Sequence, residues 1–345
     1  MIVVFIIATG LWGLGSFLRA AFWLRIALTG ALWVGVVGFH LALPDGNALR
    51  EATGGDARIW LVLGGFAVLG GGYFTALSWL KRRVPVTKTA VSQAAFRPAE
   101  LDRYARHIML REIGGAGQGK LKAAKVLVIG AGGLGSAALL YLAAAGVGVI
   151  GVIDDDVVEG SNLQRQIIHS DQRIGMAKVQ SAAVAMTALN PFIEVRPFHR
   201  RLTTDIAADL IGDFDLVLDG SDNFDTRYLV NRVCVALGKP LISGAITQWE
   251  GQLSLFDPAH GSPCYECVFP TRPAPGMVPS CAEAGVAAPL PGVIGAMMAM
   301  EAVKHITGAG ETLRGRLMIH DALFADVRVI KVKRQADCAV CGVSP

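Results

Sequence analysis

The stretch that decides the fold runs from Lys125 to Asp156 and reads KVLVIGAGGLGSAALLYLAAAGVGVIGVIDDD. Its first apolar run, Val126 to Ile129, has the unbroken hydrophobicity of a strand that is buried on both faces of a parallel sheet. The glycines that follow have G-x-G-x-x-G spacing, which permits a tight turn and lets a ligand approach the backbone without meeting a Cβ atom. These glycines are Gly130, Gly132, Gly133 and Gly135.

An apolar helix is predicted next, over Ser136 to Ala145, and a second strand over Val149 to Ile153. The free N–H groups at the start of such a helix can face an anion. Asp154 follows the second strand directly, where a carboxylate can hydrogen-bond a ribose. The stretch therefore predicts a nucleotide-binding βαβ unit, although dehydrogenases, methyltransferases and adenylating enzymes all share this glycine pattern.

Further apolar runs predict the rest of an α/β sheet with helices. Strands are expected over 193–198, 216–219, 240–245, 251–256 and 316–320, and helices over 101–113, 175–189, 225–237 and 291–306. Charged residues interrupt the last of these helices, so a buried core helix is favoured there over a membrane span. Open α/β sheets bind ligands outside the carboxyl ends of their strands, so Asp154 and Asp222 are expected to line one crevice.

The first 83 residues have a different composition. Met1 to Leu18, Ile26 to Leu43 and Ile59 to Leu80 are apolar, nearly free of charge, and each long enough or nearly long enough to span a bilayer. A cleaved signal peptide is the competing interpretation of the first run, but that run lacks a basic start and a clear cleavage site. The sequence predicts three domains: a transmembrane segment 1–83, a linker 84–100 and a catalytic domain 101–345.

The charges that flank the apolar runs predict how they cross the membrane. Arg19 and Arg25 lie between the first two runs, Lys81 to Arg83 follow the third, and the loop 44–58 is of mixed charge. The positive-inside rule therefore predicts a multi-pass membrane protein whose catalytic domain is cytoplasmic, with an outside N-terminus if there are three spans. Because the first junction is very short, two spans remain the alternative.

The net charge of +4 is concentrated in the membrane segment. Residues 1–83 hold 7 Lys and Arg against 3 Asp and Glu, whereas residues 84–345 hold 25 of each. Broad nucleic-acid binding needs a basic face, so the neutral remainder argues against it.

Four of the six cysteines form two Cys-x-x-Cys pairs about seventy residues apart. These are Cys264, Cys267, Cys338 and Cys341. Thiols stay reduced in the cytoplasm, and four thiolates in paired spacing suit a tetrahedral structural zinc site. A redox dithiol is the alternative for either pair alone.

Taken together, these motifs resemble the MoeB/ThiF/HesA family of the ubiquitin-activating superfamily. The resemblance covers Leu101 to Cys341, about seventy per cent of the chain. It rests on Arg103-Tyr104-Ala105-Arg106, the glycine turn, Asp154 to Asp156, Asn162-Leu163-Gln164-Arg165-Gln166, Lys178, Gly220-Ser221-Asp222-Asn223, Ser280 to Gly285 and the two cysteine pairs.

The resemblance implies a Rossmann-like mixed sheet of mostly eight strands, a homodimer, and MgATP-dependent adenylation of the C-terminal glycine of a small ubiquitin-like sulfur carrier that ends in Gly-Gly. It implies that Gly133 approaches the phosphates, Asp154 holds the ribose, and Asn162, Arg165 and Lys178 contact the triphosphate. Asp222 is expected to bind Mg²⁺, and Arg106 to reach the ATP of the partner subunit. Cys281 aligns with a cysteine that receives the acyl or sulfur group in some members.

These residue types suit the chemistry that the resemblance implies. A carboxylate that attacks the α-phosphorus approaches a polyanion, so cations such as Arg165, Lys178 and bound Mg²⁺ must offset the charge. A terminal carboxylate is already ionised near pH 7, so no general base is needed.

Two features depart from the family pattern. The membrane segment is not part of the family core, and the rhodanese domain of some eukaryotic members has no counterpart in the sequence, so a separate sulfurtransferase or desulfurase is expected to supply sulfur. The pathway, whether molybdopterin, thiamine or another, is left open. The alternative functions are a dehydratase that adenylates a tRNA base or small molecule, an NAD-dependent oxidoreductase, and a non-catalytic module that docks a ubiquitin-like protein.

Overall fold

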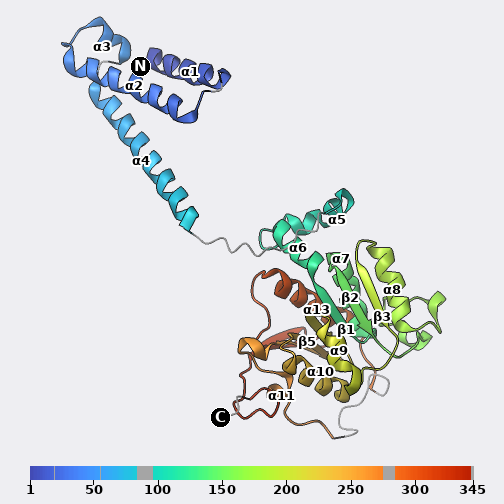
Figure 1. The fold of residues 1–345 in the computed structure, drawn as a ribbon. Helices are drawn as coiled ribbons and strands as arrows, with labels where there is room; N and C mark the ends of the chain where they lie inside the picture. Colours follow the sequence, from blue (N-terminus) through green and yellow to red (C-terminus); the bar gives the residue numbers. More distant parts are fainter. Residues whose placement is uncertain (19, 55, 84–95, 275–283, 343–345) are drawn as a thin grey trace. The chain divides into compact units, whose positions relative to one another are not determined.

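In the computed structural model, a mixed sheet of eight strands forms the frame of residues 89–345 (Figure 1). The strands are β1 (Lys125–Ile129), β2 (Val149–Ile153), β3 (Glu194–Phe198), β4 (Leu216–Asp219), β5 (Leu241–Ile246), β6 (Glu250–Phe256), β7 (Arg316–Asp321) and β8 (Asp326–Lys331). They lie in the order β3-β2-β1-β4-β5-β6-β7-β8, parallel from β3 to β5 and antiparallel from β5 to β8. The predicted α/β mixed sheet is confirmed.

Helices cover both faces of this sheet (Figure 1). They are α5 (Pro98–Ile108), α6 (Gly114–Ala123), α7 (Gly133–Ala145), α8 (Lys178–Leu189), α9 (Thr204–Gly212), α10 (Phe224–Ala236), the short α11 (Tyr265–Val268) and α13 (Leu290–Thr307). Val126 and Val128 of β1 pack with α7, α8 and α13, whereas Leu127 and Ile129 pack with α9 and α10. Alternate residues of one apolar strand thus enter two separate cores, which explains its unbroken hydrophobicity.

The helices differ from the sequence prediction in several places. The helix expected to end at Gly114 ends at Ile108, and a second helix, α6, begins at Gly114, whose φ of +58° redirects the chain. Helix α8 begins at Lys178 rather than Gly175 because Ala177 forms a β-bridge with Val157. Strand β8 and helix α9 were not predicted. Helix α13 is a buried core helix, as expected.

The structure describes the whole chain apart from residues 19, 55, 84–95, 275–283 and 343–345. The chain divides into two compact units, Met1–Lys88 and Thr89–Pro345. Most of the expected linker 84–100 lies outside the described residues, and its last residues, from Pro98, belong to α5.

The N-terminal unit consists of helices packed around two tryptophans. Its helices are α1 (Ile2–Phe17), α2 (Phe22–Ala42), α3 (Ala48–Thr53) and α4 (Ala57–Arg83). Trp33 Nε1 of α2 donates to the carbonyl of Trp60 in α4 (2.8 Å), and the indole of Trp33 occupies the place that a side chain at Gly64 would take. Glycine therefore lets α2 and α4 approach closely.

Polar contacts of Met1 and Arg25 lie at the two ends of helix α1. The Met1 amino group donates to the carbonyl of Ala52 (3.0 Å), so the chain start lies beside the 44–58 loop. At the opposite end of α1, Arg25 donates from Nη1 to Ser16 Oγ (2.8 Å) and from Nη2 to the carbonyl of Ala20 (2.8 Å). Helices α1 and α2 are therefore antiparallel, with Arg25 at their turn.

Two helical segments among the described residues are long and apolar enough to cross a membrane by length and composition, Phe22–Ala42 and Ala48–Leu77. In the most apolar 18-residue stretch of each segment, only 11% and 6% of the residues are buried. Helix α1, with 16 residues, is shorter than the usual span. Core helices of soluble proteins and signal sequences share this length and composition, so the finding alone does not assign the segment to a membrane.

Candidate functional site

A cleft of about 1080 Å³ lies at the carboxyl ends of β1, β2 and β4 and continues over β5, β6 and β7. Segments that are distant in sequence line it, and most of the predicted site residues are among the lining residues. These residues are Gly130, Gly132, Gly133, Asp154, Arg165, Lys178 and Asp222. The structure therefore places Asp154 and Asp222 in one crevice, as the parallel strand order requires.

The glycine turn between β1 and α7 needs glycine for three different reasons. Gly130 has a φ of +91°, and a Cβ atom there would lie 3.3 Å from the carbonyl of Gly220. A Cβ at Gly135 would lie 1.9 Å from the carbonyl oxygen of Gly130, so this glycine permits close packing and does not line the cleft. A Cβ at Gly133 would lie 2.8 Å from Pro291. The result is a helix N-terminus that is open to an anion at Gly132.

Asp154 hydrogen-bonds this turn as well as lining the cleft. Its Oδ2 accepts from the N–H of Ala131 (2.7 Å), and its Oδ1 accepts from the N–H of Asp156 (2.8 Å). Each carboxylate oxygen has a second lone pair, so Asp154 can still accept a hydroxyl hydrogen from a ribose.

Arg165 and Lys178 supply positive charge to one wall of the cleft. Arg165 donates from Nη2 to Asn162 Oδ1 (2.8 Å), and Asn162 in turn donates to Glu159 (3.0 Å). Asn162 does not line the cleft and instead orients Arg165. Lys178 Nζ lies 2.7 Å from Asp156 Oδ2 on a side chain that is only 7% exposed. A polyphosphate carries more negative charge than Asp156, so the side chains of Arg165 and Lys178 can leave their present partners and contact a polyphosphate that binds in the cleft.

The turn after β4 aims Asp222 into the cleft, and a buried ion pair holds this turn. Asp219 Oδ1 accepts from the N–H (3.0 Å) and the hydroxyl (2.6 Å) of Ser221. Arg227 Nη1 lies 3.6 Å from Asp219 Oδ2, and its Nη2 donates to the carbonyl of Ser221. Among the described residues Asp222 forms no ion pair or hydrogen bond, so its carboxylate is available to a ligand.

Sequence reasoning missed the residues that support these turns. His169 is buried, its Nε2 lies 2.9 Å from the carbonyl of Ala131, and its Nδ1 lies 2.9 Å from Ser181 Oγ. A carbonyl only accepts, so Nε2 carries the hydrogen; burial lowers the pKa of His169 and keeps the ring neutral. In the sequence, His169 and Arg227 are marked only by their closeness to predicted site residues. His169 lies four residues after Arg165, and Arg227 lies five residues after Asp222.

Besides Gly135 and Asn162, two further predicted residues are not brought to the cleft by the described structure. Arg106 is exposed on α5 and does not line the cleft of its own chain. Cys281 lies outside the described residues. Arg200, Arg201 and Arg272 line the cleft without having been predicted.

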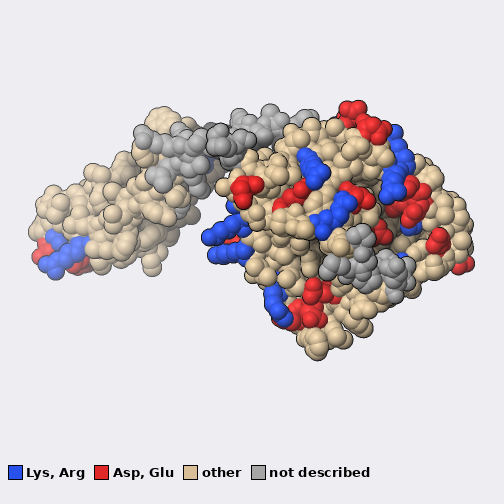
Figure 2. Space-filling view, turned by 90° about the horizontal axis from the view of Figure 1, so that it is seen from below, with Lys and Arg blue, Asp and Glu red and all other residues tan. Residues whose placement is uncertain are grey.

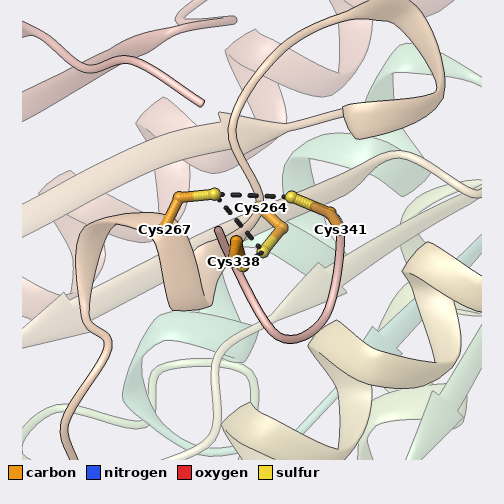
Figure 3. A group of neighbouring side chains, drawn as sticks. All are labelled: Cys264, Cys267, Cys338 and Cys341. Carbon is orange, nitrogen blue, oxygen red and sulfur yellow. Dashed lines mark hydrogen bonds between the residues drawn. The ribbon is translucent and has the colours of Figure 1, made fainter. Parts of the chain in front are cut away.

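The four predicted metal ligands converge in space (Figure 3). Cys264 and Cys267 lie at the start of α11, and Cys338 and Cys341 lie after β8. Their sulfur atoms are 3.8 Å apart for Cys264 and Cys267, 3.6 Å for Cys264 and Cys338, and 3.4 Å for Cys267 and Cys341. Zn–S bonds of about 2.3 Å in a tetrahedron place the sulfurs about 3.8 Å apart, so the cluster fits a structural zinc ion.

The electrostatics of the cluster also suit a cation. Burial raises the pKa of Cys264 and of Cys267. Burial acts the same way on Cys338, but the backbone N–H groups of Cys341 and Val340 and the thiols of Cys264 and Cys267 outweigh it and lower the pKa of Cys338 to about 7. A divalent ion would stabilise all four as thiolates and leave no open position for catalysis.

The family of the chain follows from comparison with known proteins. The sequence model of the ThiF family matches residues 104–340. The chain belongs to the ThiF family. Its ThiF region contains every residue of the cleft and all of the cysteine cluster except Cys341.

The similar curated proteins include two that the chain matches over most of their length. A sulfur carrier protein adenylyltransferase of Thermus thermophilus is 50% identical over 250 residues, which is 71% of this chain and 92% of that protein. The SAMP-activating enzyme E1 of Haloferax volcanii is 47% identical over 243 residues, or 70% and 89%. A crystal structure of E. coli MccB with ATP superposes with a TM-score of 0.61 at 25% identity, over 71% of this chain and 75% of that one.

Loss of one cysteine ligand is expected to remove the metal and destabilise this ThiF domain. Because metal binding is coupled to folding, Cys264→Ser should lower zinc content from about one ion per chain towards zero and lower the melting temperature by about 10 °C or more. Cys234→Ser, at a buried cysteine outside the cluster, is the control for cysteine loss and should keep the zinc. Loss of zinc at unchanged melting temperature, measured by metal analysis and thermal unfolding, contradicts a structural role.

The buried neutral state of His169 predicts a dependence of stability on pH. Above pH 6.5 the ring is neutral in both the folded and the unfolded chain; below it, the unfolded chain binds a proton that the folded chain resists, so stability falls as the pH falls. His169→Gln removes this contribution, and its free energy of unfolding should therefore fall less between pH 7.5 and 5.5 than that of the wild type, by up to about 1.4 kcal/mol per pH unit. Urea unfolding at both values is the measurement. Equal falls in the two proteins would show that His169 is not held neutral.

Proposed function

We propose that this chain is a sulfur carrier protein adenylyltransferase, which joins the terminal carboxylate of a small ubiquitin-like carrier to the AMP part of ATP. The observation that carries the proposal is the gathering of the glycine turn, Asp154, Arg165, Lys178 and Asp222 in one cleft. The family and the names of the two relatives support it. Neither relative is named as an oxidoreductase or a dehydratase.

The size and course of the cleft suit two substrates. Its volume of about 1080 Å³ is at the upper end of single-ligand pockets, which span about 300–1,000 Å³. The half at Gly132 and Asp154 has the groups that suit a nucleotide. The other half lies over β6 and β7 and is lined by polar side chains such as Gln252 and Ser254 together with apolar ones such as Leu317, a mixture that suits a peptide tail.

The reaction is a displacement at the α-phosphorus. An oxygen of the carrier carboxylate forms a bond to phosphorus, the bond to the leaving pyrophosphate breaks, and the products are an acyl-adenylate and pyrophosphate. Arg165 and Lys178 offset the negative charge of the polyphosphate, and the open N-terminus of α7 faces it. The carboxylate is ionised near pH 7, so no side chain must remove a proton.

The carboxylates at the cleft suit a magnesium ion. Asp222 is exposed at the cleft and has no partner in the described part of the chain, and hard oxygen ligands are the kind that Mg²⁺ prefers. When bound, the ion would neutralise phosphate charge. Asp222 is the residue that would hold it.

A homodimer and a sulfur donor complete the proposed mechanism. Arg106 is exposed away from the cleft of its own chain, and Met109 and Leu110 near it are 74% and 49% exposed, so this end of α5 is available to a second copy. Cys281 would receive the acyl or sulfur group after adenylation, with sulfur supplied by a separate sulfurtransferase or desulfurase. The pathway, molybdopterin or thiamine, is set by the carrier.

The N-terminal unit is proposed to anchor the enzyme to a membrane. The scarcity of buried positions in α2 and α4 supports this, as does the placement of Arg25 at the end of the unit opposite the 44–58 loop. With the basic residues 81–83 at the end of α4, the positive-inside rule predicts that the catalytic unit lies in the cytoplasm. Figure 2 shows charged side chains gathered at one end of this unit, whereas the visible face of the catalytic unit mixes both signs, which offers no broad basic surface for nucleic acid.

The two half-reactions should separate by mutation. Asp222→Ala should lower ATP–pyrophosphate exchange in the presence of the carrier at least about 100-fold, because loss of a metal clamp costs several kcal/mol of barrier. Cys281→Ala should leave this exchange near normal and lower only acyl or sulfur transfer. Mass spectrometry of the carrier distinguishes the two products.

Two results would contradict these roles. One is adenylation of the carrier by Asp222→Ala at the wild-type rate. The other is normal thiocarboxylate formation by Cys281→Ala. Asp209→Ala, at an exposed carboxylate of α9 that does not line the cleft, is the control for loss of a carboxylate and should keep most of the exchange activity.

Removal of residues 1–88 should release the enzyme from membranes without loss of adenylation. Every proposed site residue belongs to the unit Thr89–Pro345, so the truncated chain should be soluble and keep exchange activity within about threefold. The full chain should sediment with membranes after alkaline wash. A full chain that remains in the soluble fraction contradicts the anchor, and an inactive but folded truncated dimer contradicts the division of roles.

A further inference from the structure

Gln166 belongs to a motif of the cleft, but nothing described so far gives its side chain a role. The residue is 5% exposed and lines the cleft, and its Oε1 atom is buried without a hydrogen-bond partner among the described residues. His40 Nδ1 and His320 Nδ1 share this property in the described residues, but neither lines the cleft. A buried polar atom without a partner costs free energy, so it points to a partner that arrives with a ligand.

The backbone around Gln166 is fixed. Its N–H donates to the carbonyl of Asn162 (3.0 Å), and its own carbonyl accepts from the N–H of His169 (3.1 Å). The ring of His169 then bonds the carbonyl of Ala131 in the glycine turn (2.9 Å). The segment from Gln166 to His169 is thus tied to Asn162 at one end and to the glycine turn at the other.

The amide group faces the open part of the glycine turn. A Cβ atom at Gly132 would lie 3.8 Å from Gln166 Nε2, its only neighbour within 4 Å, so the missing side chain of Gly132 leaves room beside the amide. Phosphate oxygens only accept hydrogen bonds, and Nε2 has two hydrogens to donate. The amide therefore offers a donor to a phosphate at the turn and an acceptor to a hydroxyl or water deeper in the wall.

We propose that Gln166 contacts the bound nucleotide: Nε2 donates to a phosphate oxygen of ATP, and the side-chain amide turns on binding so that Oε1 accepts from a water that enters with the nucleotide. This inference rests on the proposed function, because it requires ATP in the cleft. Arg165 and Lys178 attract the polyphosphate by charge, whereas a neutral amide adds a directional contact that fixes its position.

The test replaces Gln166 with an apolar side chain of similar length and separates nucleotide binding from stability. Gln166→Met removes the unpartnered acceptor, so the nucleotide-free melting temperature should stay unchanged or rise. The dissociation constant for MgATP, from equilibrium dialysis, should rise about tenfold, as for the loss of one hydrogen bond to a charged group, and the ATP-induced rise in melting temperature should shrink with it. Gln166→Glu keeps the shape but adds negative charge, and should weaken MgATP binding further.

Gln118→Met is the matched control. Gln118 is fully buried, donates to the carbonyl of Ala145 (2.8 Å) and does not line the cleft. Its replacement should lower the nucleotide-free melting temperature and leave the affinity for MgATP unchanged. If Gln166→Met behaves like this control, or binds MgATP as the wild type does, the proposed contact is overturned. If the wild type itself does not bind MgATP, the proposed function fails instead, so the two failures are distinguishable.

Discussion

Two hydrogen bonds fix the backbone of Ala131, one to its N–H and one to its carbonyl, and the geometry of the cleft depends on them. Its N–H donates to Asp154, at the end of β2, and its carbonyl accepts from His169, in the segment before α8. The glycine turn, the Asp154 carboxylate and the segment that carries Arg165 are therefore joined by hydrogen bonds. A site built this way does not have to reorganise its dipoles when a polyanion enters, which is the main source of electrostatic catalysis.

The turn after β4 repeats the same principle with a different residue. Ser221 donates to Asp219 and accepts from Arg227, so both of its backbone polar groups are engaged while the next residue, Asp222, stays free. Strands β1 and β4 are neighbours, and their two turns meet where a Cβ at Gly130 would approach the carbonyl of Gly220. Buried partners thus fix the backbone of both turns, and exposed side chains are left for chemistry.

The sequence predicts a structural feature correctly where a pattern of residue types has a single physical explanation. The apolar run at Val126, the glycine spacing and the paired cysteines are of this kind, and the structure confirms the strand, the turn and the cluster. Helix α6 was missed because it begins at two glycines, which usually end helices, and β8 because Asp326 to Lys331 is mostly exposed. The roles of His169 and Arg227 were not predicted because they depend on contacts that form only in the folded chain. His169 bonds Ala131, which lies 38 residues away, and Arg227 bonds Ser221, which lies 6 residues away. The roles of Arg106 and Cys281 depend on a second subunit and on residues outside the described structure, and stay predictions.

The cysteine cluster also acts as a cross-link. It joins the segment after β6 to the segment after β8, so the chain between Cys267 and Cys338 becomes a closed loop of about seventy residues. That loop contains α13, the β7–β8 hairpin and the position of Cys281. With zinc bound, neither the hairpin nor α13 can separate from the sheet by a long excursion, because both ends of the loop are tied at one point. The cross-link therefore limits local unfolding of the β7–β8 hairpin to short openings, and this edge of the sheet stays assembled.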